Sequence, residues 1–178
     1  MKIRSGFVSN SSSSSFVVCF PRKPESVDDV QEMLFGSNEN YYPYNFKEVY
    51  TAKQVSETVW KDICTVGEAT EEQVSDIFEN MGDDYTTIEA FEFERMCEDR
   101  DDDRIPDFNT NSKKWSEWNR KYAMARRKAA VAEAKKWLLG KEDYCVYTFE
   151  FHDDTSYGSA LEHGELFRRL IHKKVSNH

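Results

Sequence analysis

Two strand-like runs near opposite ends of the chain constrain its fold most strongly. Residues 16–20 (FVVCF) are β-branched or aromatic and stop at Pro21, whereas residues 144–152 alternate apolar with polar side chains. The first pattern is typical of a short buried strand and the second of a strand with one apolar face. A buried strand must pair its backbone N–H and C=O groups, so the two runs are expected to share one sheet.

The direction of this pairing decides whether the two ends of the chain meet. Antiparallel strand pairs outnumber parallel pairs roughly two- to three-fold, which favours an antiparallel arrangement. The serine run 11–15 would then lie near His152 and the neighbouring Glu162 and His163. Parallel pairing would instead separate the two groups by a strand length.

Helical patterns fill most of the chain between the strands. They begin at Ser26, Thr51, Thr70 and Ser112, and the last of them is the longest. Segment 86–99 is ambiguous, because its phenylalanines alternate with glutamates like a strand while its composition suits a helix.

A turn after the second strand leads to a final short helix with Leu166, Phe167 and Leu170 as its apolar stripe. The sequence therefore predicts an α+β protein of one domain, 1–178. Its small antiparallel sheet is built from the N-terminal and C-terminal strands and packed with several helices, including one long helix near 112–139.

The long helix has an aromatic face and a basic face. Trp115, Trp118 and Tyr122 fall on one side at spacings of three and four, and the lysines and arginines fall on the other. The aromatic side chains are therefore expected in the core, where they cannot stack on nucleotide bases. We expect no nucleic-acid partner on this ground.

Charge is distributed unevenly along the chain, whose net charge is −9. Residues 25–107 carry 24 acidic and six basic side chains, whereas residues 113–141 carry ten basic and two acidic ones. The two stretches either attract each other within the fold or face different partners. We expect the intramolecular match, although an acidic surface could also mimic DNA phosphates and occupy a host nuclease or repressor.

The chain has neither a membrane-span pattern nor a signal-peptide pattern. No window approaches the roughly 18 consecutive apolar residues of a span, and the N-terminal segment has no apolar core. The four cysteines are spread singly, without a C-x-x-C pair. We expect no membrane contact and a location inside the cell, in the cytoplasm.

The string RSGFVSNSSSSSF, residues 4–16, has two interpretations. Five consecutive serines are typical of a flexible linker. The run feeds directly into a strand, however, and a serine-rich turn can present backbone N–H groups and hydroxyls to an anion. A composite site at the meeting of the two ends would contain the following residues: Arg4, Asn10, Ser11, Ser12, Ser13, His152, Glu162 and His163.

This string resembles the start of a group of small uncharacterised proteins of tailed bacteriophages and some bacteria. Their chains begin R-x-G-F-V-S-N-S-S-S-S-S-F and often end with an E-H-G segment and a terminal histidine, as do Glu162, His163, Gly164 and His178 here. The group has no established activity. The resemblance implies a viral origin, hence an infected bacterial cell, and implies that the two ends belong to one structural unit.

All four histidines lie in the last 27 residues, which favours a metal site. His163, His172 and His178 are candidate ligands for a divalent transition metal, with Glu162 or Asp153 near enough in sequence to add a carboxylate. The spacing matches no known signature. Alternatively, Glu162 closes a capping box and His172 complements the dipole of a last helical turn.

Two further patterns are incomplete. A Ser/His/acid triad can be assembled from the serine run, His163 and Glu150 or Asp153, but the chain has no G-x-S-x-G elbow. The acidic run 98–103 opens like a calcium loop and then lacks its glycine and its final glutamate. We interpret the run as a solvated loop that contacts a partner through the following residues: Asp99, Asp101, Asp102 and Asp103.

The sequence thus favours a bacteriophage accessory protein that binds a host or viral macromolecule, most simply a host protein, without catalysis. A small metal-dependent or hydrolytic enzyme using the composite site is one alternative. A virion component is the other.

Overall fold

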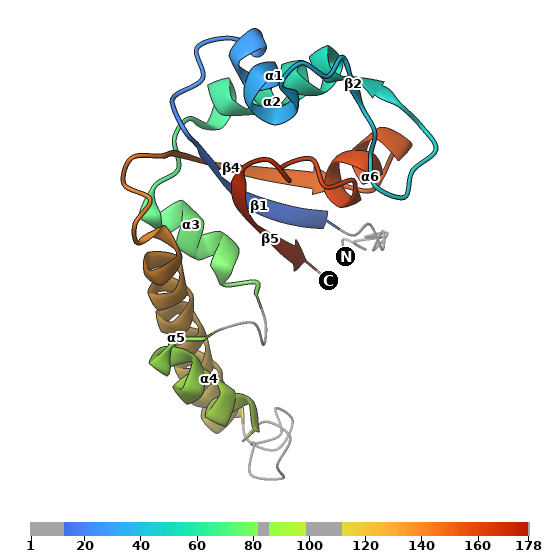
Figure 1. The fold of residues 1–178 in the computed structure, drawn as a ribbon. Coiled ribbons are helices and arrows are strands. Elements are labelled where there is room, and N and C mark those ends of the chain that lie inside the picture. The colour runs from blue at the N-terminus through green and yellow to red at the C-terminus, as the bar shows by residue number, and fades with distance from the viewer. Residues whose placement is uncertain (1–12, 82–85, 99–111, 178) are drawn as a thin grey trace.

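A three-stranded antiparallel sheet lies at the centre of the computed structural model (Figure 1). The structure describes residues 13–81, 86–98 and 112–177. The strands, in the spatial order β4-β1-β5, are β1 (Ser13–Phe20), β4 (Cys145–His152) and β5 (Ile171–Asn177). The N-terminal strand is therefore the central one, which confirms the predicted sheet and its antiparallel direction.

The register of the sheet brings the start of β1 beside the ends of both neighbours. Ser13 pairs with His152 on β4 and with Asn177 on β5, whereas Phe20 pairs with Cys145. Because β1 has a partner on each edge and a helical layer on each face, all five residues of the FVVCF run are buried. Strand β4 is buried on one face only, through Tyr147, Phe149 and Phe151.

Strand β5 replaces the final helix that the sequence predicts. Helix α6 (Ser156–His163) ends at Gly164, and Glu165 then takes a left-handed φ of 59°, which a continuing helix cannot contain. Leu166 and Phe167 are buried in the turns that follow. The chain then extends along the second edge of β1 instead of forming a helix.

One face of the sheet is covered by α1 (Val27–Phe35), α2 (Ala52–Val66) and α6 (Figure 1). The predicted N-cap Ser26 accepts a hydrogen bond from the first turn of α1, and Thr51, at the predicted start of the second helix, accepts one from the first turn of α2. A two-stranded ribbon, β2 (Asn40–Tyr41) with β3 (Tyr50–Thr51), links these helices. Aromatic side chains from β1 and β4 fill the core beneath them.

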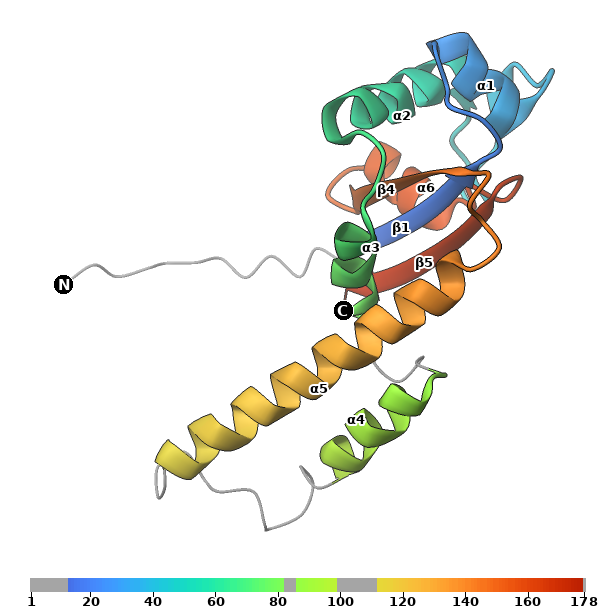
Figure 2. The ribbon, with the colours of Figure 1, turned by 90° about the vertical axis from the view of Figure 1, so that its left-hand side faces the viewer.

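The other face carries α3 (Glu71–Phe78) and α5 (Ser112–Leu138), with α4 (Ile88–Glu98) packed along α5 (Figure 2). The ambiguous segment 86–99 is therefore mainly helical. Its Ala90 and Phe93, three residues apart, are buried in the same cluster as alanines of α5. No helix within the described part of the chain is long and apolar enough to cross a membrane.

The long helix is confirmed, and its predicted aromatic core is confirmed in part: Tyr122 packs against the buried cluster that includes Ala129 and Ala130, whereas Trp115 and Trp118 do not belong to that cluster. Trp115, Trp118 and Tyr122 are only half-buried, whereas Ala129 and Ala130 are fully buried. Small side chains allow α3 and the sheet to approach the C-terminal half of α5. The N-terminal half extends past the sheet and lies along α4 (Figure 2). Tyr122 packs there against Phe93, with ring centroids 5.2 Å apart.

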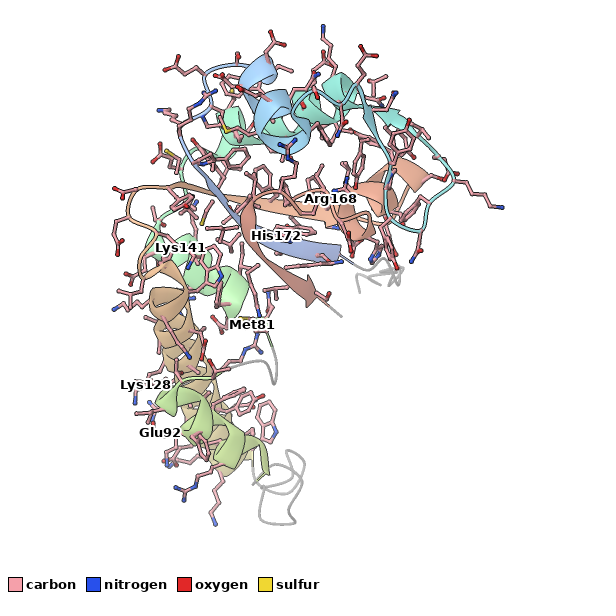
Figure 3. All side chains as sticks on the ribbon, viewed as in Figure 1. Met81, Glu92, Lys128, Lys141, Arg168 and His172 are labelled. Atoms are coloured by element: carbon pink, nitrogen blue, oxygen red, sulfur yellow. The ribbon has the colours of Figure 1, made fainter. Side chains whose placement is uncertain are left out.

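Ion pairs between α5 and the acidic helices confirm the intramolecular charge match. Arg127 lies 2.5 Å from Asp76 and 3.2 Å from Glu79, both in or next to α3. Lys128 lies 3.1 Å from Glu92 on α4 (Figure 3). Exposed pairs of this kind contribute about 0–1 kcal/mol each, so they orient the helices more than they stabilise them.

Replacement of Phe20 by alanine tests the core assignment. Phe20 is fully buried against Tyr147 and Phe149, so Phe20→Ala should lower the free energy of unfolding by about 3–5 kcal/mol. Urea unfolding followed by circular dichroism measures this loss. Tyr42→Ala, at an exposed aromatic residue, should change stability by less than about 0.5 kcal/mol. Equal effects of the two variants would contradict the assignment.

Candidate functional site

The candidate site lies where β1 begins, β4 ends and α6 ends. Helix α6 begins four residues after β4 ends, and its first turn packs tightly on that strand end, because a side chain at Gly158 would clash with the carbonyl oxygen of His152. Thr155 caps this helix by accepting a hydrogen bond from the Gly158 amide. The last turn of α6, which carries Glu162 and His163, lies beside the start of β1, where Glu162 contacts Ser14.

A buried carboxylate is the centre of the site. The side chain of Glu162 is 0 % exposed, and its Oε1 accepts a 2.8 Å hydrogen bond from the hydroxyl of Ser14, which is also fully buried. A buried carboxylate is costly unless polar groups satisfy it. The serine run and the E-H-G segment therefore meet through a specific bond. The helix cap is Thr155, so the capping-box interpretation of Glu162 is wrong.

Two basic side chains lie against Glu162. Nε2 of His163 is 3.6 Å from Oε1 of Glu162, and the imidazole is 40 % exposed. The ammonium of Lys174, on β5, donates a 2.9 Å hydrogen bond to the backbone oxygen of Glu162 and lies 3.4 Å from Nδ1 of His163. Burial lowers the pKa of Lys174, while the charge of Glu162 acts in the opposite direction.

Asp153 completes the cluster. It follows β4 directly, and one potential ligand atom of Asp153, of Glu162 and of His163 lies within 4.8 Å of each of the others. In residues 13–81, 86–98 and 112–177 this is the one group of three or more such side chains with metal-ligand geometry. The three residues offer two carboxylates and one imidazole.

His152 lies on the other face of the sheet. Neighbouring residues of a strand point to opposite faces, so His152 and its register partner Ser13 point away from the face of Ser14 and Glu162. The imidazole of His152 is exposed, and its Nε2 lies 3.9 Å from Glu150. Of the predicted composite site, the structure brings Glu162 and His163 together and separates them from Ser13 and His152.

His172 is part of β5 and not of a helical turn, so the dipole interpretation is wrong (Figure 3). Its Nδ1 lies 3.0 Å from the backbone oxygen of Leu170, and it does not belong to the cluster of Asp153. The remaining predicted site residues lie outside the described residues: Arg4, Asn10, Ser11, Ser12, His178, Asp99, Asp101, Asp102 and Asp103.

The geometry does not assemble the Ser/His/acid triad with the described serines. Ser14 donates to the carboxylate of Glu162 instead of to an imidazole, and it is buried away from any substrate. Glu150 lies on the opposite face of the sheet from His163.

Lys174 is a site residue that sequence reasoning missed, whereas Ser14 lies in the predicted run 11–15 but was not among its named candidates. Lys174 was hidden by the prediction of a final helix, since only a strand at 171–177 places it beside β1, opposite Phe16. The serine run gives no signal that distinguishes Ser14 from its neighbours until the face of β1 that packs against α6 is known.

Comparison with known proteins returns no match: no family model, curated protein or solved structure is significantly similar to this chain.

Replacement of Ser14 by alanine tests the central hydrogen bond. Ser14→Ala leaves the buried Glu162 carboxylate without this hydroxyl donor, so the free energy of unfolding should fall by about 1–3 kcal/mol. Ser176→Ala is the matched control, because Ser176 pairs with Ser14 in register and is exposed. Urea unfolding should show almost no change for the control. A Ser14→Ala variant as stable as the control would show that the bond contributes nothing.

Proposed function

We propose that this chain is a bacteriophage accessory protein that acts in the cytoplasm of the infected bacterium by binding a host protein. The binding surface is the arm, which consists of α4 and residues 112–125 of α5. Figure 2 shows α4 alongside this half of α5, away from the sheet. The viral origin is supported by the resemblance of the two chain ends to the bacteriophage proteins described above. The arm is the proposed binding surface for the host protein.

Exposed apolar side chains on the arm are the observation that carries this proposal. Ile88 is 82 % exposed, Phe91 71 % and Met124 66 %. Phe91 and its near neighbour Phe93 take opposite roles, since Phe93 is buried against α5 and Phe91 points to solvent. Ile88 and Phe91 lie three residues apart on α4 and so share one side of that helix, and exposed large apolar side chains on one side of a helix favour a protein-binding surface.

Charge indicates the chemistry of the partner. Two basic residues of α5 beyond the arm are paired with carboxylates, Arg127 with Asp76 and Lys128 with Glu92. The acidic run 98–103 begins at Glu98, the last residue of α4. A partner surface with an apolar patch bordered by lysine and arginine side chains would complement both the exposed apolar residues and the acidic run.

Paired variants of the arm test the proposal. The full chain is immobilised and used to capture proteins from a bacterial lysate, in parallel with Ile88→Asp/Phe91→Asp. Recovery of a defined partner should fall about tenfold or more in the double variant, because residues at the centre of an interface contribute most of its affinity. Recovery by the unchanged chain should also fall as salt rises from about 0.05 to 0.5 M.

A control variant separates specific binding by the arm from nonspecific hydrophobic binding. Leu139→Asp removes another exposed apolar side chain, located after the end of α5, and should leave recovery unchanged. Charge reversal at Asp101, Asp102 and Asp103 should weaken recovery. Capture of chaperones alone would contradict the proposal. Unchanged recovery of the partner by both Ile88→Asp/Phe91→Asp and the charge-reversed variant would also contradict it.

A further inference from the structure

We propose that Asp153, Glu162 and His163 form a binding site for a divalent transition-metal ion of the zinc class. This site is independent of the arm, since it lies at the start of β1 and uses none of the arm's residues. It differs from the ligand set that the sequence favours, because it includes His163 but not His172.

The geometry is close to that of a coordinated ion. Zinc binds imidazole nitrogen and carboxylate oxygen at about 2.0–2.2 Å, so ligand atoms of one tetrahedral ion lie about 3.3–3.6 Å apart. Nε2 of His163 and Oε1 of Glu162 are already 3.6 Å apart, and the whole set lies within 4.8 Å. Small side-chain rotations of Asp153 and His163 would close the set, since neither is fully buried.

Glu162 and His163 differ in how firmly the protein holds them, and this difference favours binding of a metal ion. Glu162 is held in the interior, with its Oε1 oriented by the hydroxyl of Ser14, as an outer-shell partner orients a ligand. His163 is partly exposed and gives an ion a path from solvent. Two carboxylates so close together repel each other, and a bound cation relieves that repulsion. One imidazole with two carboxylates suits zinc, cobalt or manganese, and three protein ligands leave a position open.

The ammonium group of Lys174 should weaken binding of the metal ion. Its ammonium lies 3.4 Å from Nδ1 of His163. Coordination through Nε2 leaves the imidazole proton on Nδ1, where it faces the ammonium, so two donors meet and Lys174 must turn away. The positive charge of Lys174 also repels a cation at this distance. Removal of that charge should therefore strengthen metal binding, a result that a purely structural cluster does not predict.

Calorimetric titration of the full chain with zinc chloride tests the site, using protein made without a histidine tag and freed of metal by chelation. We expect one zinc ion per chain. Asp153→Asn and His163→Gln should each weaken binding at least about tenfold, and Lys174→Met, which keeps the apolar stem, should strengthen it. Cobalt absorption spectra and the imidazole NMR signals of His163 report the ligands directly.

Asp154→Asn and His172→Gln are the matched controls, since each is an exposed residue of the same type outside the cluster. Both should bind zinc like the unchanged chain. The inference is overturned if the unchanged chain takes up no stoichiometric zinc. It is also overturned if Asp153→Asn and His163→Gln bind as tightly as the controls, or if Lys174→Met binds more weakly. Asp153 and His163 are not fully buried, so these two variants test the site even if Glu162→Gln does not fold.

Discussion

The pairing of β1 with a strand on each edge is the interaction on which the rest of the structure depends. β1 contributes Phe16, Val18 and Phe20 to the core under α1 and α2, and Val17 to the core over α3 and α5. Its two neighbours come from the C-terminal third of the chain, so no local folding unit can complete the sheet. The same pairing sets Ser14 above Glu162 and Lys174 beside it, which makes the candidate site a product of the sheet register.

The fold was predictable where hydrophobic pattern and turn chemistry agree. The FVVCF run, the alternation of β4 and the caps at Ser26 and Thr51 all identify elements that the structure contains. β5 was not predictable in the same way, because His172, Lys173 and Lys174 give it no apolar alternation. It exists because β1 offers a second edge, and this tertiary effect is absent from the local sequence.

The candidate site was half predictable for a related reason. Antiparallel pairing was enough to bring the serine run towards Glu162 and His163, but it did not say which serine faces them. Side-chain direction alternates along a strand, so a shift of one residue moves a side chain to the other face of the sheet. His152 and Ser13 fall on the wrong face for this reason. The full burial of Ala129 and Ala130 in α5, where Trp115 and Trp118 are only partly buried, likewise depends on how closely α3 and the sheet approach.

Native-state hydrogen exchange tests the central role of β1 most directly. Amides of Val17, Val18 and Cys19 are enclosed by two strands and two helical layers, so they should exchange only through global unfolding, with the opening free energy measured by urea. Amides of α4, which packs mainly on α5, should exchange through a smaller opening that leaves the sheet intact. Exchange of the β1 amides as fast as those of α4 would contradict the account.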